Sequence, residues 1–233
     1  MIQFEGLTKT YVMGDETVHA LAGVSLTIER GESVAIIGPS GSGKSSLMNI
    51  LGGLDRPTAG RYLFEGEDVG AFDDNDLAAF RNARIGFVFQ SFQLLPRLSA
   101  LQNVELPMIY AGVEPAERRD RAAALLEKVG LGARMGHRPT QMSGGQQQRV
   151  AIARSLANQP HLLLADEPTG ALDTQTGQDV LRLFQELNDE GLTLVIVTHD
   201  LEVAAETRRR VTFRDGHIVS DDHGGSRSAG APA

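Results

Sequence analysis

The sequence predicts an α/β fold with a mostly parallel core sheet, an N-terminal antiparallel β subdomain and an inserted helical subdomain. The main observation is a set of three short apolar runs, IGFVFQ (85–90), HLLLADE (161–167) and LTLVIVTHD (192–200). Uninterrupted runs of this length are typical of parallel strands that are buried on both faces. The helical pattern of PAERRDRAAALLEKVG lies between the first two runs, which places the helical part inside the core in sequence order.

The first 37 residues predict the antiparallel subdomain. Four short β-rich segments follow one another there, IQFEGL, KTYVM, VHALAGVSLTIE and ESVAIIG. We expect turns at Gly14-Asp15 and at Arg30-Gly31-Glu32, where turn-forming residues interrupt the β pattern. The last segment, ESVAIIG, is apolar and leads directly into a glycine-rich loop, so we expect it to be a core strand.

Apolar periodicity predicts the helices and the limits of the domain. Besides residues 115–130, we expect helices at 46–54, 150–158 and 175–188. Residues 1–220 then form a single domain, with the helical subdomain at about 92–158. The tail, residues 221–233, has no apolar periodicity and is expected to be disordered.

Composition excludes several classes of protein. The 22 basic and 30 acidic residues give a net charge of −8, which disfavours a nucleic-acid partner, because duplex binders usually carry a basic surplus. There are no cysteines, which excludes a disulfide framework or a thiolate metal site. The N-terminus lacks a signal-peptide pattern, and no apolar run approaches the roughly 18 residues that a membrane span needs. Any association with a membrane is therefore expected to occur through a partner.

A phosphate-binding motif follows the segment ESVAIIG. The stretch GPSGSGKS fits G-x-x-x-x-G-K-[ST] and stands between a predicted strand and a predicted helix, as the motif requires. Its glycines allow backbone N–H groups to approach phosphate oxygens, and the following helix N-terminus favours an anion. We expect Lys44 to bridge the β- and γ-phosphates of a nucleotide and Ser45 to hold Mg²⁺. The predicted phosphate loop comprises Gly38, Pro39, Ser40, Gly41, Ser42, Gly43, Lys44 and Ser45.

Two acidic residues end the apolar run HLLLADE. Asp166 and Glu167 alone would suggest a solvated strand end, but the phosphate motif changes the interpretation. Asp166 is expected to bind Mg²⁺, and Glu167 to orient the attacking water. An ordinary Glu has a pKa near 4.3 and is a weak base at neutral pH, so positioning should matter more than proton removal.

A second anion-binding feature is predicted at MSGGQQQRV (142–150). Ser143 and Gln146 form an S-x-x-Q capping box, and Ser143 is therefore expected to cap a helix. Gly144 and Gly145 leave the first amides of that helix uncovered, which favours an anion.

These residues carry a resemblance to a known family. MSGGQ and the following QQRVAIARSLANQPHLLLADEPTGALD resemble the signature region of ABC-type ATPases, and the likeness extends over residues 2–219. The resemblance implies ATP and Mg²⁺ as cofactors and a homodimer of two head-to-tail subunits. Each signature helix would close over the γ-phosphate held by the phosphate loop of the other subunit.

The resemblance also assigns roles to isolated residues. Tyr11 resembles the aromatic residue that stacks on adenine, and Gln90 the glutamine that contacts Mg²⁺ and the attacking water. Asp173 resembles the aspartate that communicates across the dimer interface, and His199 the histidine that reaches the γ-phosphate. Ser46 stands where the family commonly has Thr and keeps the hydroxyl. Taken without the resemblance, each of these residues would have an ordinary structural interpretation.

Longer stretches are similar to one branch of the family. NILGGLDRPTAG, IGFVFQSFQLLPRLSALQNVELPMIYAGV and PTGALD resemble the macrolide-exporter and lipoprotein-release ATPase subunits. The branch implies a pair of membrane permeases as partners and a peripheral place on the cytoplasmic face of a bacterial inner membrane. Because the sequence stops shortly after Ile218, we expect the permease to be a separate polypeptide. The permease is expected to dock between Gln90 and the helical subdomain. Six apolar residues would line that groove, about half of them serving internal packing: Phe92, Leu94, Leu95, Leu98, Leu101 and Val104.

Two alternatives to a transport ATPase remain. The first is a regulatory ATPase of a membrane complex in cell division or antibiotic sensing, with no substrate transported; the shared ATPase residues barely separate it. The second is a soluble ABC ATPase of DNA repair or translation, which would need a long heptad insertion or two cassettes. The sequence contains neither, so this alternative is disfavoured.

Overall fold

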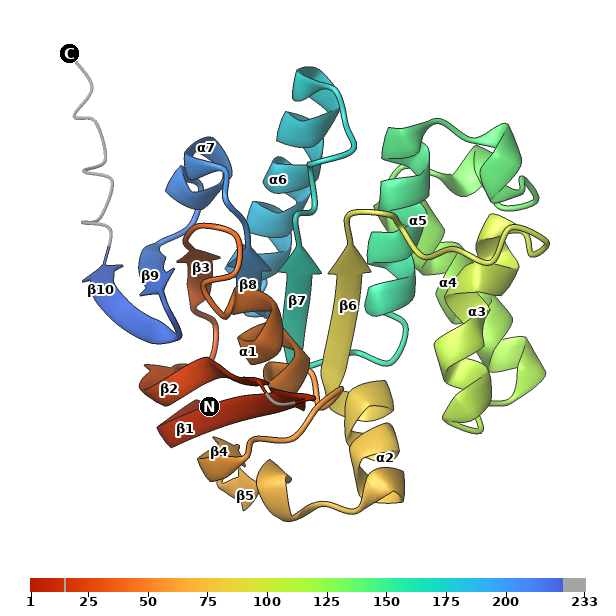
Figure 1. Cartoon of the computed structure of the whole chain (residues 1–233). Helices are drawn as coiled ribbons and strands as arrows, with labels where there is room; N and C mark the ends of the chain where they lie inside the picture. The colour runs from red at the N-terminus through yellow and green to blue at the C-terminus, as the bar shows by residue number, and fades with distance from the viewer. Residues whose placement is uncertain (15, 224–233) are drawn as a thin grey trace.

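The computed structural model describes residues 1–14 and 16–223, and divides their strands between two sheets (Figure 1). The larger sheet runs in the order β10 (His217–His223), β9 (Arg209–Arg214), β3 (Ser33–Ile37), β8 (Thr193–Val197), β7 (Leu162–Asp166) and β6 (Ile85–Phe89). Neighbouring strands from β9 to β6 are parallel, and only β10 is antiparallel to its neighbour. This mostly parallel sheet confirms the predicted fold class.

The smaller sheet is antiparallel and contains the N-terminus. Its order is β2 (Glu16–Ile28), β1 (Ile2–Met13), β4 (Ala59–Phe64) and β5 (Glu67–Asp68). The two segments expected within residues 2–13 form one strand, because irregularities in its pairing with β2 absorb the break at Gly6. Of the expected turn at Gly14-Asp15, Asp15 lies outside the described residues.

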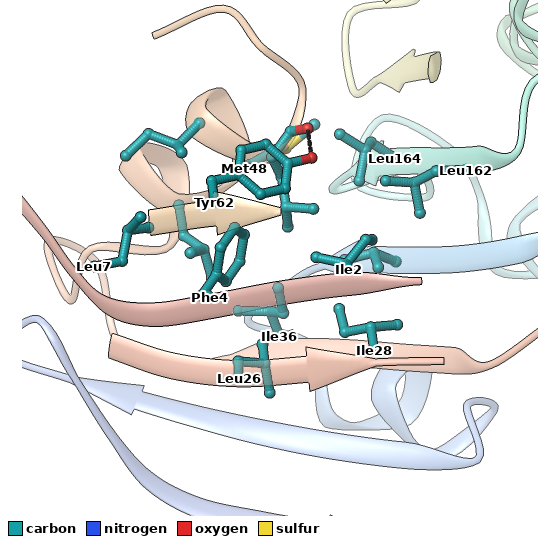
Figure 2. Packing of buried hydrophobic residues seen from close by; sticks show 14 of the residues in the cluster. Ile2, Phe4, Leu7, Leu26, Ile28, Ile36, Met48, Tyr62, Leu162 and Leu164 are labelled. Atoms are coloured by element: carbon teal, nitrogen blue, oxygen red, sulfur yellow. Dashed lines mark hydrogen bonds between the residues drawn. The ribbon is translucent and has the colours of Figure 1, made fainter. Parts of the chain in front are cut away.

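The core sheet separates two apolar clusters. In β7, Leu162 and Leu164 face the cluster shared with the small sheet, whereas Leu163 and Ala165 face the cluster shared with the helices. Because both faces of the strand are covered, residues 162–165 are all apolar. Figure 2 shows the first cluster, in which the ring centroids of Phe4 and Tyr62 lie 4.9 Å apart.

Helices cover the sheets and form the inserted part. The helices are α1 (Lys44–Leu51), α2 (Asp74–Arg84), α3 (Ala100–Tyr110), α4 (Pro115–Lys128), α5 (Gly144–Ser155), α6 (Thr174–Asp189) and α7 (Leu201–Ala205). Three short 3-10 turns, η1 (Val69–Ala71), η2 (Gly132–Arg134) and η3 (Pro139–Gln141), complete the set. Helices α3, α4 and α5 follow β6 and gather beside it (Figure 1).

The structure corrects two helix limits. Helix α5 begins at Gly144 instead of 150 and ends at Ser155, because the capping box of Ser143 starts it earlier than the apolar periodicity does. Helix α1 begins at Lys44, two residues before the expected start.

The expected tail boundary at residue 220 is also wrong by three residues. Strand β10 continues to His223, and Asp221 pairs with Val211 of β9 in the sheet. The carboxylate of Asp221 accepts two hydrogen bonds of 2.7 Å from Arg209, so a polar edge strand is held without an apolar pattern. Residues 224–233 lie outside the described part of the chain.

Candidate functional site

The predicted phosphate loop lies between the end of β3 and the start of α1. It packs so closely on two strands that two of its positions require glycine. A Cβ on Gly38 would lie 2.2 Å from the carbonyl oxygen of Phe213 in β9. A Cβ on Gly43, whose φ is 104°, would lie 2.3 Å from the carbonyl oxygen of Ala20 in β2. Both positions therefore exclude any side chain, and the loop keeps a backbone whose N–H groups can approach a ligand.

Lys44 is buried at the centre of this loop. Its ammonium donates hydrogen bonds of 2.8 Å to the carbonyl oxygens of Gly38 and Pro39. Burial lowers the pKa of Lys44, while the nearby carboxylates of Glu167 and Asp166 oppose that change. The loop thus places a desolvated cation beside two acids, where a phosphate and a metal ion would complete the charge balance.

Two features of the loop fit a nucleotide phosphate. The hydroxyl of Ser42 is buried and has no hydrogen-bond partner, which is costly unless a ligand supplies one. No side chain caps the N-terminus of α1, and no acidic residue lies in its first turn, so its amides remain available to an anion.

Asp166 is the last residue of β7 and is placed by its neighbours in the sheet. It pairs with Phe89 of β6 and Val197 of β8, so three strand ends meet at the same edge. Burial and the adjacent Glu167 raise the pKa of Asp166, and only Lys44 acts in the other direction. A carboxylate in this environment is stabilised by an added cation.

The donor set fits Mg²⁺ held together with nucleotide phosphates. Among residues 1–14 and 16–223, no three His, Asp or Glu side chains gather into a protein-only metal site. The expected ligands are Ser45, Gln90 and Asp166, which supply neutral and anionic oxygens. Mg²⁺ is usually bound in this way, by one or two protein groups plus waters and substrate phosphates.

Glu167 follows Asp166 and has a left-handed backbone with φ of 44°. Its Oε1 accepts from the backbone N–H of His199 at 2.9 Å and lies 2.6 Å from Nδ1 of the same residue. Its Oε2 accepts from the hydroxyl of Thr198 at 2.9 Å. The carboxylate is thus held from three sides at the carboxyl ends of the parallel strands, where open α/β sheets bind ligands.

Gln90 is exposed just beyond β6 and leans over the turn that follows Glu167. Its Nε2 atom lies 2.7 Å from the place that a Cβ on Gly170 would occupy. The structure therefore brings the Gln90 side chain against the turn at Gly170, three residues after Glu167.

The signature segment, residues 142–150, has the predicted capping box and a close contact with α6. The Gln146 amide donates to Oγ of Ser143 at 3.3 Å, and the Ser143 amide donates to the Gln146 side chain at 3.1 Å. A Cβ on Gly145 would lie 2.2 Å from the methyl carbon of Thr176 in α6. The start of α5 is thereby fixed against the start of α6.

Asp173 caps α6 within its own subunit. Its carboxylate accepts from the Thr176 hydroxyl at 2.6 Å and from the Thr176 amide at 3.0 Å. These hydrogen bonds lower the pKa of Asp173. The contact across a dimer that the resemblance implies would come in addition to this capping role.

Two residues that contact Glu167 or the following Pro168 are not identified by the sequence analysis. Thr198 is one; it directly follows the apolar run LTLVIV, and no neighbouring residue in the sequence marks its contact with Glu167. The other is Gln148, fully buried, whose Nε2 donates to the carbonyl oxygen of Pro168 at 2.6 Å. Gln148 ties the signature helix to the residue after Glu167.

The phosphate loop and the signature helix pack against different elements. Helix α1 packs against β2 and β8, whereas α5 packs against α3, α4, α6 and β6. The two helix starts that the sequence predicts to bind anions therefore lie on helices with different packing partners.

The six residues expected to line a docking groove differ in their exposure. Val104 is fully buried inside the helical part and Leu95 is 44% exposed. The other four residues are partly buried. A cavity of about 730 Å³ lies elsewhere, between α2, β6 and the ends of α3 and α5. None of the six residues lines it, and its rim includes the exposed side chains of Leu54 and Tyr110.

No helix among residues 1–14 and 16–223 has the length and apolar character needed to cross a bilayer.

Comparison with known proteins identifies close relatives over almost the whole chain. A family model described as ABC transporter matches residues 21–170. An uncharacterized ABC transporter ATP-binding protein of Bacillus subtilis, YknY, is 57% identical over 99% of this chain and 100% of its own length. The macrolide export ATP-binding/permease protein MacB of Hyphomonas neptunium is 53% identical over 99% of this chain, which spans 36% of that protein.

A solved structure agrees with the fold. The ATP-binding cassette MJ0796, in a dimeric post-hydrolysis state bound to ADP and Pi, is 46% identical and superposes with a TM-score of 0.88. The match covers 96% of this chain and 98% of that one.

Proposed function

Because the chain belongs to the ABC transporter family of ATP-hydrolysing proteins, we propose that two copies bind Mg-ATP between them and drive a separate membrane permease. The buried Lys44 beside Asp166 and Glu167 is the observation that carries the proposal. Export of a substrate, release of a lipoprotein or mechanical transmission are the outputs that fit the branch, since several relatives are named export proteins.

Within one subunit, the residues of the loop bind and orient the nucleotide. Lys44 exchanges its carbonyl partners for β- and γ-phosphate oxygens, and the loop amides and Ser42 complete the phosphate contacts. Mg²⁺, when bound, neutralises phosphate charge, and Asp166, Ser45 and Gln90 are the groups that would hold it. The reaction then depends mainly on positioning and on electrostatic stabilisation.

Glu167 orients the attacking water. A carboxylate fixed by Thr198 and His199 can accept a hydrogen bond from water without itself having to be a strong base. His199, whose side chain is 76% exposed, is then free on its other ring nitrogen to contact the γ-phosphate.

A second copy supplies the missing half of each site. Ser143, Gly144, Gly145 and Gln146 present the N-terminus of α5, and this helix start packs away from the phosphate loop of its own chain. A head-to-tail dimer would place it over the γ-phosphate of the partner subunit. The dimeric state of the cassette MJ0796 supports this arrangement.

The permease would dock in the cavity between α2, β6, α3 and α5. Its lining is mainly apolar, and Tyr110 and Leu54 are 77% and 50% exposed at its rim. A short amphipathic helix of a membrane protein is the kind of element that fills such a groove. We place the ATPase on the cytoplasmic face of a bacterial inner membrane through this contact, with no nucleic acid as a partner.

The regulatory alternative keeps the same ATPase and the same docking. In that case the permease-like partner controls cell division or antibiotic sensing, and no substrate crosses the membrane. The partner, rather than this chain, determines which output occurs.

The substitution Glu167→Gln tests the ATPase part of the proposal. We expect ATP to bind while hydrolysis falls by about 10²- to 10⁴-fold, and the variant to form a dimer in saturating Mg-ATP. The exposed Glu186 of α6 provides a matched control, because Glu186→Gln makes the same charge change away from the site. Normal turnover of Glu167→Gln, or a monomer in Mg-ATP, would contradict the proposal.

Capture of partners tests the membrane part. Tagged Glu167→Gln is purified from detergent-solubilised membranes with Mg-ATP, with and without Tyr110→Ser, and the bound proteins are identified by mass spectrometry. We expect a permease that is lost with Tyr110→Ser. Recovery from the soluble fraction with ribosomal or nucleic-acid proteins would refute the membrane assignment.

A further inference from the structure

Tyr11 is attached to the rest of the site by its hydroxyl. The residue lies in β1, opposite Val18 of β2, and its hydroxyl donates to Oδ2 of Asp55 at 3.0 Å. The same hydroxyl lies 3.5 Å from Oγ of Ser46 in the first turn of α1. The hydrogen bond of its hydroxyl therefore orients the ring, close to the helix α1 that follows the phosphate loop.

Asp55 accepts hydrogen bonds from three groups. Besides Tyr11, the ammonium of Lys9 lies 2.6 Å from Oδ1, and the backbone N–H of Arg56 donates to the same oxygen at 2.7 Å. Burial would raise the pKa of Asp55, but these hydrogen bonds outweigh it and the pKa is lowered. The carboxylate is thus a fixed, charged acceptor at neutral pH.

Lys9 holds the other side of the ring. Its ammonium lies over the Tyr11 ring, 5.0 Å from the centroid, within the range of a cation–π contact. It also donates to the carbonyl oxygen of Arg56 at 2.8 Å, and its side chain is only 12% exposed. Because the ammonium covers one face, a base that stacks on Tyr11 must use the opposite face.

The segment that carries Asp55 is itself anchored. After α1 the chain turns back, and the amides of Leu54 and Asp55 donate to the carbonyl oxygen of Asn49 at 2.7 and 3.2 Å. On the other side, Thr58 exchanges hydrogen bonds of 2.8 and 3.0 Å with Thr8 and Thr10 of β1. The distance between α1 and the strand of Tyr11 is thereby fixed.

We propose that Asp55 and Lys9 are positioning residues that hold the Tyr11 ring in the orientation that stacks on the nucleobase of ATP. The inference rests on the proposed function, because the stacking role of Tyr11 comes from the family resemblance. Neither residue needs to touch the nucleotide. Their effect is to order the ring before the ligand arrives, which lowers the cost of binding.

Affinity for ATP and for tripolyphosphate separates this effect from phosphate binding. Binding of both ligands is measured by calorimetry for wild type, Tyr11→Phe, Asp55→Asn, Lys9→Met and Tyr11→Ala. We expect the first three variants to bind ATP about three- to tenfold more weakly, the loss expected for one ordering contact. Tyr11→Ala should lose about 5- to 100-fold, the loss expected for a stacked base. Tripolyphosphate affinity should stay unchanged in every variant, and kcat at saturating ATP should stay unchanged in Asp55→Asn and Lys9→Met.

Asp74→Asn serves as the control. Asp74 is exposed, lies near the same loop and pairs with Arg56, so the variant makes the same chemical change without touching Tyr11. It should bind both ligands like the wild type.

The possible failures are distinguishable. Wild-type ATP affinity of Tyr11→Phe and Asp55→Asn, together with weak binding by Tyr11→Ala, would overturn the positioning role and leave the stacking role intact. Wild-type affinity of Tyr11→Ala would overturn the stacking role as well. A loss for Asp55→Asn that is equal for tripolyphosphate would assign Asp55 to the phosphate loop or to stability, and would also overturn the proposal.

Discussion

The hydroxyl of Thr198 donates to Oε2 of Glu167 at 2.9 Å and accepts from the amide of Asp200 at 3.0 Å. The carboxylate can only accept, so the single proton of the hydroxyl points to Glu167, while the amide of Asp200 holds the hydroxyl oxygen. Thr198 is only 1% exposed, so the contact is shielded from solvent. A buried hydroxyl thus holds a carboxylate whose own backbone is in a sparsely populated conformation with φ of 44°.

Replacement of Thr198 by Val should slow hydrolysis without weakening ATP binding. Val keeps the shape but removes the donor, so Glu167 loses one of its three contacts. We expect kcat to fall about 10- to 100-fold, as expected for loss of orientation, with little change in KM. Steady-state kinetics of Thr198→Val and Thr198→Ser provide the measurement, and Ser should retain most of the activity. A larger loss in Thr198→Ser than in Thr198→Val would show that the methyl group, not the hydroxyl, is important.

The substitution Gly145→Ala should disrupt the start of α5, whereas Gly144→Ala should be tolerated. A Cβ on Gly145 would lie 2.2 Å from the Thr176 methyl carbon, but one on Gly144 would meet nothing closer than 3.5 Å. We expect Gly145→Ala to lower the free energy of unfolding by about 1–3 kcal/mol, the usual cost of overpacking. Chemical denaturation measures this difference.

A second substitution checks the cause of that loss. Thr176→Ser removes the methyl group and retains the hydroxyl that bonds to Asp173. Gly145→Ala combined with Thr176→Ser should recover most of the lost stability. Failure to recover would mean that the clash is not the source of the loss.

Tyr62→Phe should lower the free energy of unfolding by about 1–2 kcal/mol. The hydroxyl of Tyr62 is fully buried and donates to the carbonyl oxygen of Leu51 at 2.8 Å, at the last residue of α1 (Figure 2). Burial raises the pKa of this hydroxyl, so it remains a proton donor over the whole accessible pH range. Urea unfolding gives the measurement, and Tyr110→Phe, at a residue that is 77% exposed, is the matched control.

Stability should decrease in acid partly through Asp221. Hydrogen bonds from Arg209 hold the pKa of Asp221 below its ordinary value of 3.8. A lowered pKa stabilises the folded chain above the unfolded value, and this contribution disappears as the pH falls through the folded value. The difference in unfolding free energy between wild type and Asp221→Asn should therefore be constant from about pH 7 to 5 and shrink below about pH 4. A difference that is independent of pH would contradict this prediction.

Sequence reasoning identified the core strands because burial on both faces leaves a short, uninterrupted apolar run, too short for a buried helix. It missed α2 and α3, whose starts are marked by capping boxes at Asp73 and Ser99 rather than by apolar periodicity. Pro107 inside α3 adds a signal against a helix, although the helix continues through it. Strand β10 was missed because ion pairs, not apolar packing, hold its end.

For the candidate site, the residues of the phosphate loop and the acidic pair could be named from contiguous motifs. Thr198, Gln148 and Asp55 could not, because each acts on a residue far away in the sequence. The Tyr11–Asp55 bond joins positions 44 apart, and the Thr198–Glu167 bond joins positions 31 apart. Such partners become visible only when the sheet brings distant strand ends together.

The packing of Gly38 and Gly43 on two different strands has a further consequence. The loop leans on β9 of the core sheet and on β2 of the small sheet, and the turn residue Gly216 donates to the Ser42 carbonyl while accepting from the Ala22 amide. The phosphate loop therefore contacts both sheets and connects them. A ligand bound to this loop should make the two sheets unfold in a single cooperative transition. Without the ligand, the two sheets should unfold in separate transitions on heating or under force.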